Sequence, residues 1–332
     1  PGAQPFIVAG SGTLAMELSI ANLVEPGDKA LVVNAGFFSD RMADVLKTHG
    51  AEVDIAPSAL GEVPGVDAVR TMLKADKYKL MCITQVDTST GIRSQVKELA
   101  AVARSEGVLS VVGGVCAVTG EELRQDEWSV DVALTASQKA VGVPPGLALL
   151  VAGPRALGAF NARKTPVRSY YCDWGKWLPV MEAYEARKPA YFGTPAVNLV
   201  RALNVSLGQI LEEGMELRFK RHELGARAMR AGLKAMGMGF VPAREDLCAS
   251  TLTAPWYPEG IDASVLSRIA AEGVVLAGGL HPEIKARYFR IGHMGANGAT
   301  EILATLGAIE RGFAASGYRF GAGEAVAAAQ AV

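Results

Sequence analysis

The chain has 332 residues, half of them hydrophobic, so it can bury a core large enough for more than one folding unit. It carries 33 basic and 34 acidic residues and no long basic run interleaved with aromatics, which argues against nucleic-acid binding. No apolar stretch approaches the ~20 residues that cross a bilayer, which argues against a membrane protein. The 4 cysteines form no CxxC pair, which argues against a disulfide framework or zinc site and favours a cytoplasmic location.

Because the sequence begins at Pro1 and not at a methionine, we expect that residues precede it. A targeting signal among them would change the expected location.

Short aliphatic and β-branched runs alternate with helical patterns through the first two thirds of the chain. We predict strands at 30–34, 52–56, 80–84, 109–112, 130–135 and 146–151. Between them, residues 94–106 carry apolar side chains at helical spacing, and Gly107 follows as a stop. Continuously apolar strands separated by helices predict an α/β fold with a mostly parallel sheet covered on both faces. Ligands of such sheets lie at the carboxyl ends of the strands.

The pattern changes near residue 196, where a long helical stretch runs to about residue 236 and contains two possible bends, Gly208 and Gly214. Beyond it, strands at 250–254, 274–277 and 288–291 with helices between them predict a smaller α+β domain. The Ala/Gly-rich residues 321–332 are expected to form a frayed or helical tail. We predict a large domain over residues 1–212 and a small C-terminal domain over residues 213–332.

Two of the segments that join the predicted strands and helices have the composition of a cofactor site. Residues 10–13 read Gly-Ser-Gly-Thr and precede an expected amphipathic helix over 14–23, where backbone N–H groups and hydroxyls can bind a phosphate. A turn that merely caps the helix fits this short motif as well. Lys139 lies between two apolar strands and could form a Schiff base there, although an ordinary turn lysine has the same spacing.

Two further loops carry groups that can bind a ring or a carboxylate. Residues 87–91 read Asp-Thr-Ser-Thr-Gly, and the hydroxyls can donate to a phenolate or phosphate or can simply cap a turn. Arg290, flanked by Phe289 and Ile291, can clamp a substrate carboxylate with two parallel hydrogen bonds, or can serve a structural salt bridge. His293 nearby is expected to be a packing residue.

Together these segments resemble the class V aminotransferases of fold type I, and specifically the alanine–glyoxylate and serine–glyoxylate group. The most specific match is Ser-Gln-Lys-Ala-x-x-x-Pro-Pro-Gly-Leu-Ala over residues 137–148. Residues 289–295, Phe-Arg-Ile-Gly-His-Met-Gly, are nearly as distinctive, and residues 191–195 look like the family's Tyr-x-x-Thr-Pro segment. The resemblance covers nearly the whole chain and implies a seven-stranded, mostly parallel sheet in the large domain.

The resemblance implies an enzyme that uses pyridoxal 5'-phosphate to move an amino group from alanine or serine to glyoxylate or pyruvate. Lys139 would hold the cofactor as a Schiff base and then shuttle a proton at the substrate Cα. Arg290 would bind the α-carboxylate of the small amino-acid or 2-oxo-acid substrate.

The remaining implied residues hold the cofactor. The phosphate would be bound by Ser11, Gly12, Thr13 and Gln138. The ring would stack between Phe38 and Val115, with Thr88 beside its polar substituents. Tyr191 and Thr194 would reach across a homodimer interface to the partner's phosphate, so the site would be incomplete in a monomer.

Two positions depart from the family pattern. Where the family has an aspartate that pairs with the pyridine nitrogen, this chain has Gly113, so the ring would be a poorer electron sink. The acidic residues Glu121, Glu122 and Asp126 lie further along and are expected in a helix. The family also has a segment before the residues that match Pro1 onwards, which packs on the dimer and borders the substrate pocket.

Three functions therefore remain open at this point. The first is an active aminotransferase. The second is a catalytically impaired protein of the same fold that binds cofactor or a partner only, which Gly113 keeps under consideration. The third is another pyridoxal-phosphate enzyme, such as a lyase or desulfurase, which is disfavoured because no cysteine lies in a loop that looks mobile and polar.

Overall fold

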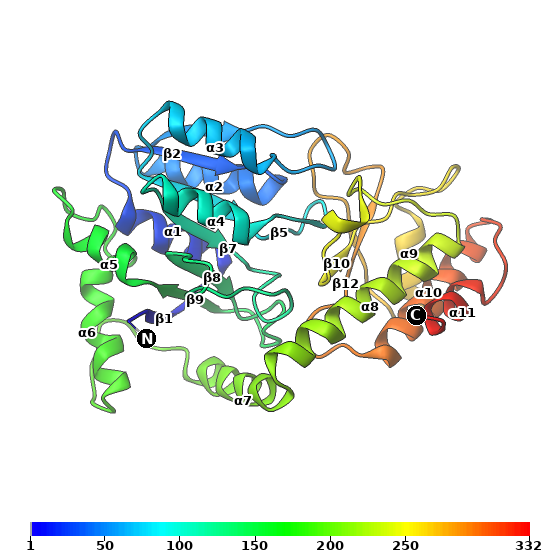
Figure 1. Cartoon of the computed structure of the whole chain (residues 1–332). Helices are drawn as coiled ribbons and strands as arrows, with labels where there is room; N and C mark the ends of the chain where they lie inside the picture. Colours follow the sequence, from blue (N-terminus) through cyan, green and yellow to red (C-terminus); the bar gives the residue numbers. More distant parts are fainter. Residues whose placement is uncertain (1) are drawn as a thin grey trace.

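The structure is a computed structural model, and it describes residues 2–332. Its centre is a seven-stranded sheet with the strand order β1-β9-β8-β7-β4-β2-β3 (Figure 1). The strands are β1 (Gln4–Ala9), β2 (Lys29–Val33), β3 (Glu52–Ala56), β4 (Leu80–Thr84), β7 (Leu109–Gly113), β8 (Val132–Ala136) and β9 (Leu147–Ala152). Among these described strands, β9 alone runs against the rest, because it pairs antiparallel with both β1 and β8. The predicted mostly parallel α/β sheet is confirmed.

Helices cover both faces of this sheet. They are α1 (Gly12–Leu23), α2 (Phe37–Thr48), α3 (Val66–Ala75), α4 (Val96–Ser105), α5 (Pro154–Asn161) and α6 (Trp174–Glu185). Successive side chains of a strand point to opposite faces, so each central strand contributes to two cores. Val32 and Cys82 pack in the core that α1 and α2 close, whereas Leu31 and Met81 pack in the core that α3 and α4 close. The central strand β4 is buried along its whole length because neither of its faces meets water, whereas the edge strands β1 and β3 are partly exposed.

Two details differ from the expectations. The first helix begins at Gly12, before residue 14, and it is buried on nearly all sides instead of being amphipathic, because it lies between the sheet and its helical neighbours. The acidic residues do not lie in a helix: Glu121 forms an isolated β-bridge with Val118, Glu122 lies in an irregular segment, and Asp126 lies in a turn. Thr119 has a φ of 74°, which no right-handed helix accommodates, and Glu121 points inward to pair with Arg93 at 3.4 Å.

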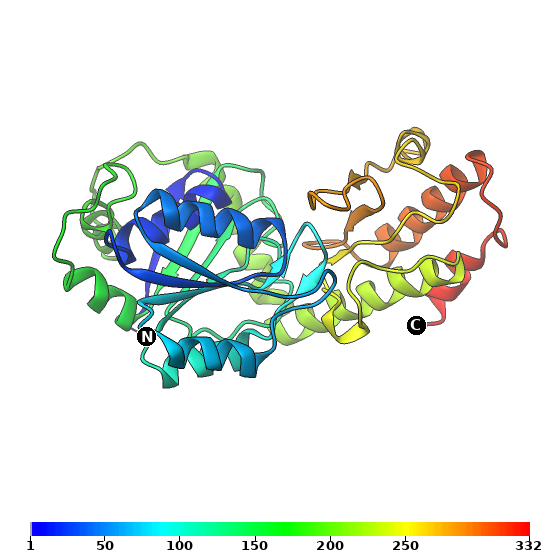
Figure 2. The same ribbon diagram turned by 90° about the horizontal axis from the view of Figure 1, so that it is seen from above.

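The helix α7 (Val197–Glu213) packs on the large unit, where Leu203 and Leu199 meet Val143 and Leu147. The elements after it form a smaller unit beside the large sheet (Figure 2). From α7 onward the elements are α8 (Met215–Ala235), a 3₁₀ turn (Glu245–Leu247), β10 (Leu252–Thr253), α9 (Val265–Ala271), β11 (Ala277–Gly278), β12 (Phe289–Gly292), α10 (Ala299–Ala315) and α11 (Glu324–Gln330). The strands form an antiparallel sheet in the order β10-β12-β11. The long helical stretch breaks at Gly214, which has a φ of 80°, whereas Gly208 lies inside α7. The Ala-rich tail forms α11, whose Ala325 and Ala329 are buried against α8 and α10.

The predicted boundary between residues 212 and 213 falls at the end of α7 and stays a prediction. Among residues 2–332, no helix combines the length and the apolarity needed to cross a membrane. The same residues contain no cluster of histidine, cysteine and acidic side chains that could hold a metal ion.

Candidate active site

A cavity of about 210 Å³ opens at the carboxyl ends of the parallel strands. It is the place where loops after several strands converge, as the topology of open α/β sheets requires. Its walls are Ser11, Gly12, Thr13, Met16, Phe38, Arg41, Thr84, Val86, Thr88, Gly113, Val115, Gln138 and Lys139. The structure therefore brings together every site residue predicted from the sequence except Arg290, Tyr191 and Thr194.

Lys139 lies three residues beyond β8, in a loop that is fixed at both ends. The Ser137 hydroxyl donates to Pro144 O at 2.8 Å, and the Gly142 amide donates to Lys139 O at 2.9 Å. Arg218, buried on α8, donates to Ala140 O at 2.9 Å and holds the next residue of the loop. Within residues 2–332 the Lys139 amine has no hydrogen-bond partner, so it is available for a covalent bond at the cavity.

The start of α1 forms the anion-binding end of the cavity. The helix has no side-chain cap at Ser11 and no acidic residue in its first turn, so its first N–H groups and dipole favour a negative charge. A Cβ atom on Gly12 would lie 3.0 Å from Val115 Cγ2, so any larger residue would have to displace this wall of the cavity. Gln138 Oε1 is buried without a hydrogen-bond partner, and Arg41 donates to Thr13 Oγ1 at 3.2 Å. Helix start, hydroxyls and guanidinium fit the phosphate of a cofactor.

The cavity also offers surfaces for a flat ring. Phe38 and Val115 supply apolar walls, and Thr88 is nearly buried with its hydroxyl 3.7 Å from Cys116 Sγ. Gly113 ends β7 at this place and contributes backbone only. Among the described residues that line the cavity, no side chain is acidic.

Arg290 lies next to the cavity wall instead of on it. Its Nε donates to Gly278 O at 2.8 Å, and its Nη1 donates to Thr88 O at 3.1 Å. Its Nη2 has no partner among residues 2–332, so the end of the guanidinium retains donors for a carboxylate. These two contacts to backbone oxygens hold the Arg290 guanidinium beside Thr88, which lines the cavity.

The structure does not bring Tyr191 and Thr194 to the cavity of their own chain. They lie between α6 and α7, their hydroxyls are 3.3 Å apart, and Tyr191 is 75% exposed. Their predicted contact with a cofactor therefore stays a prediction that requires a second subunit.

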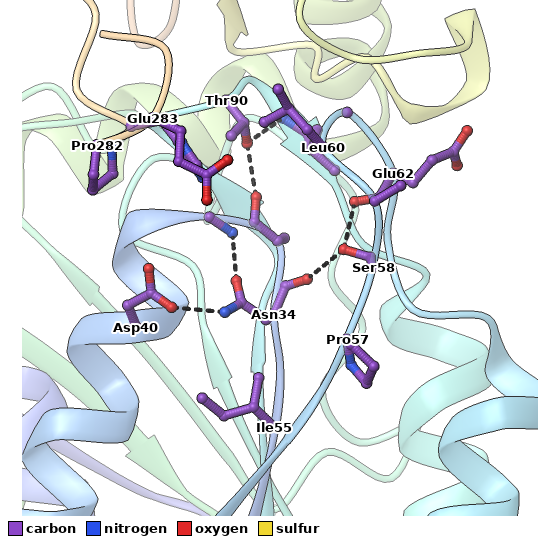
Figure 3. A pocket seen from close by; sticks show the side chains of 16 residues that line it. Asn34, Asp40, Ile55, Pro57, Ser58, Leu60, Glu62, Thr90, Pro282 and Glu283 are labelled. Atoms are coloured by element: carbon purple, nitrogen blue, oxygen red, sulfur yellow. Dashed lines mark hydrogen bonds between the residues drawn. The ribbon is translucent and has the colours of Figure 1, made fainter.

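A second cavity, of about 330 Å³, lies on the other side of the loop between β2 and α2 (Figure 3). Asn34 lines it from that loop, and Asp40 lines it from the first turn of α2. Glu62, after β3, and Glu283, in the C-terminal unit, line it as well. None of the predicted site residues lines it.

Two residues that the structure places at the site were not predicted from the sequence. Arg41 lines the cavity, and its guanidinium lies 4.9 Å from the centre of the Phe38 ring. Its signal was its position three residues after Phe38, on one face of α2. Asp87 is buried directly behind the wall and holds the loops that form it. Its only signal was its place at the start of the hydroxyl-rich segment.

The family model described as aminotransferase class-V matches residues 3–279. The chain belongs to the class-V aminotransferase family. Alanine–glyoxylate aminotransferase 1 of Saccharomyces cerevisiae is 39% identical to it over 304 residues, which cover 88% of this chain and 78% of that protein. L-aspartate–glyoxylate aminotransferase of Paracoccus denitrificans is 34% identical over 334 residues, which cover 99% of this chain and 83% of the relative.

The crystal structure of ureidoglycine–glyoxylate aminotransferase from Bacillus subtilis superposes with a TM-score of 0.91 at 28% sequence identity. The superposition covers 98% of this chain and 84% of that chain. The fold is therefore fold type I, and the class-V aminotransferase described here is a pyridoxal-phosphate-dependent transaminase. The residues present fit this cofactor: the free amine of Lys139 faces the cavity, and the uncapped start of α1 suits a phosphate.

Proposed function

We propose that this class-V aminotransferase transfers the amino group of a small amino acid, alanine or serine, to glyoxylate or pyruvate. The observation that carries the proposal is the arrangement, at the carboxyl ends of the strands, of a free lysine amine, an uncapped helix start and an arginine whose Nη2 is free. The relatives reported above share glyoxylate in their names and differ in the amino compound. This agreement supports glyoxylate as the acceptor.

The side chains around the cavity favour a small donor. The cationic residues that line it are Lys139, needed for the covalent bond, and Arg41, which is committed to Thr13 at the phosphate end. Arg290 can bind one carboxylate with its free end. A donor with a second carboxylate would need a further cation, which the described walls of this cavity do not offer.

Each residue has a defined task in this reaction. When bound, pyridoxal phosphate supplies an electron sink for bond breaking at the substrate Cα. The Lys139 amine moves the proton at that carbon, and Arg290 orients the substrate by its α-carboxylate. Phe38 and Val115 exclude water from the apolar part of the cavity.

A spectrum of the purified protein with a donor panel tests this function. We expect a visible band from the lysine-bound cofactor, loss of that band on adding alanine, and release of pyruvate. Glyoxylate should then restore the band and yield glycine. A band that no donor changes would support the binding-only alternative, and absence of any band would contradict cofactor binding.

We also propose that the enzyme works as a homodimer in which Tyr191 and Thr194 complete the partner's phosphate site. Tyr170, Tyr191, Val197 and Leu211 are large apolar side chains exposed around α6 and α7, which suits an interface. Mixing inactive Lys139→Ala with inactive Tyr191→Ala subunits should restore about a quarter of the activity, because each mixed dimer keeps one intact site. No restoration after subunit exchange would contradict the proposal.

For the location we propose the cytoplasm. Its support is that Cys82, Cys116, Cys172 and Cys248 are all free and buried, which suits a reducing compartment. Fractionation of cells that express the full-length protein would test it, and recovery in an organelle or outside the cell would contradict it.

A further inference from the structure

A buried carboxylate lies directly behind the wall of the active site. Asp87 ends the short strand β5 (Val86–Asp87), which pairs with β6 (Ile92–Arg93), and its side chain is 0% exposed. Its Oδ2 accepts hydrogen bonds from the Phe38 amide at 2.9 Å and the Ser39 amide at 3.3 Å. Its Oδ1 accepts from the Ser89 amide at 2.9 Å and the Ser89 hydroxyl at 2.6 Å. Four donors thus converge on one carboxylate.

The contacts to Phe38 and Ser39 make Asp87 the cap of helix α2. The residue at the N-cap is Gly36, which has no side chain to satisfy the first N–H groups of the helix. A Cβ atom on Gly36 would lie 2.6 Å from Ser89 Oγ and 2.8 Å from Asp87 Cγ, so glycine is required for the carboxylate to reach the helix. The negative charge also interacts favourably with the helix dipole.

The loop that leads from β2 into α2, and so to Phe38, is fixed from its other side as well. Asn34 accepts from the Gly36 amide at 2.9 Å and donates to Asp40 at 2.7 Å, and Thr90 donates to Ala35 O at 2.9 Å (Figure 3). The segment from Asn34 to Ser39 is therefore held by polar contacts both on the side of the second cavity and on the side of Asp87.

The segment that follows Asp87 also contacts the C-terminal unit. Thr88 O accepts from Arg290 Nη1 at 3.1 Å, and Ser89 O accepts from the hydroxyl of the fully buried Tyr288. Asp87 is therefore hydrogen-bonded on one side to Phe38, on the wall of the cavity. On the other side it is hydrogen-bonded to Ser89, next to Thr88, whose carbonyl oxygen holds Arg290.

We propose that Asp87 is a positioning residue that sets Phe38 and Thr88 against the cofactor ring and, through the backbone of residues 88–89, aligns Arg290 with the substrate carboxylate. This inference rests on the proposed function. An ionised carboxylate accepts hydrogen bonds only, so it suits four donors. An asparagine of the same shape would turn an NH₂ group toward either the Phe38 and Ser39 amides or the Ser89 amide, and at least one N–H group would lose its acceptor.

Asp131 offers a matched control at the amino-terminal end of β8, at the opposite end of the parallel strands from the cavity. It is 5% exposed, accepts from the Ser110 amide at 2.8 Å and pairs with Arg155 at 3.1 Å, immediately before β8 begins. Asp131→Asn also removes a buried carboxylate that binds a backbone amide, and it lies away from the cavity. A general loss of stability should therefore affect both variants.

The experiment compares the two variants as holoenzymes by three measurements. These are the dissociation constant for pyridoxal phosphate, the circular dichroism of the visible cofactor band, and the KM for alanine. We expect Asp87→Asn to raise the dissociation constant and the KM about tenfold each and to reduce the dichroism, because one lost buried hydrogen bond has this magnitude. Asp131→Asn should keep all three at the wild-type values, even where its melting temperature falls equally.

Values for Asp87→Asn that match those of Asp131→Asn would overturn the inference. If Asp87→Asn yields no folded protein, Ser89→Ala takes its place, because it removes one donor to Asp87 and the acceptor of the Phe37 amide at 3.1 Å. That variant should shift the same three quantities by about threefold, and unchanged values would overturn the inference. A wild-type protein without any cofactor band would instead overturn the proposed function and the inference with it.

Discussion

Replacing Gly113 with aspartate should accelerate the reaction, and the structure has room for the change. Gly113 lines the cavity at the end of β7. A Cβ atom there would meet only Ile83 O, at 3.8 Å, which is ordinary van der Waals contact. Its φ is not positive, so an L-residue adopts the same backbone without strain. A carboxylate at this place would face the pyridine nitrogen and favour the protonated ring, which is the stronger electron sink.

The size of the effect follows from two opposing contributions. An ion pair about 4 Å apart is worth roughly 4 kcal/mol at an effective dielectric constant of about 20. The cost of removing the new carboxylate from water opposes this attraction. The same cost acts on other acids of this protein, because burial raises the pKa of Asp87 and of Asp131. If about half of the attraction survives, roughly 2 kcal/mol remains, which corresponds to about a thirtyfold faster proton transfer. We therefore expect an acceleration of about ten- to a hundredfold with little change in KM.

Stopped-flow single turnover with alanine measures this step directly, through the decay of the visible cofactor band. Gly113→Asn is the matched control, because it adds nearly the same bulk without the charge. Gly113→Asp should be faster than the wild type, and Gly113→Asn should not be. The reasoning is refuted if the aspartate variant is unchanged or slower, or if the asparagine variant is accelerated equally.

Three further predictions test other parts of the site. Lys139→Ala should abolish transamination while leaving the melting temperature nearly unchanged, because one amine supplies both the covalent bond and the proton transfer; residual turnover above a trace contradicts this role. Arg290→Lys should raise the KM for alanine about tenfold or more and leave the cofactor dissociation constant within about twofold, since lysine lacks the planar fork; an unchanged KM would make Arg290 structural. Burial lowers the pKa of His222 from 6.5 to about 4, so the folded state resists its protonation. Stability should be fully present above pH about 6.5 and should fall by on the order of 3 kcal/mol as the pH drops to about 4, measured by urea unfolding. His222→Gln should lack this part of the pH dependence, and an identical slope in both proteins would contradict the assignment.

The central strands of the sheet could be predicted from the sequence because they are buried on both faces, and the partly exposed edge strand β3 was found from its short apolar run. The predicted ranges 52–56 and 80–84 coincide with β3 and β4. The strand β1 was not predicted, because only Phe6 and Val8 of its six residues are buried and Pro5 interrupts the pattern. The short strands of the C-terminal unit were placed within a few residues, since two-residue strands leave almost no periodic signal.

The cavity could be predicted to the extent that topology alone assembles it. A lysine after one strand and a helix start after another must meet at the same sheet edge, whatever lies between them. Contacts between side chains and residues that are distant in the sequence cannot be predicted from the order of strands and helices. Arg41 contacts Thr13, and Arg218 contacts Ala140 O, through geometry that appears only when helices are packed on the sheet. Gly36 is explained in the same way, since its missing Cβ leaves space for Asp87.

The structure also answers whether another carboxylate replaces the one that Gly113 lacks. Asp87 is the buried acid behind the cavity wall, and all of its hydrogen-bonding capacity is directed at amides and one hydroxyl away from the cavity. Glu121 is turned toward Arg93 and the Ser250 amide at the junction with the C-terminal unit. Moving either side chain toward the ring would leave buried N–H groups without acceptors, which costs about as much as the new ion pair would gain. A cofactor ring beside Gly113 is therefore expected to meet backbone and not a charge, and this is the reason that a single aspartate there should change the rate.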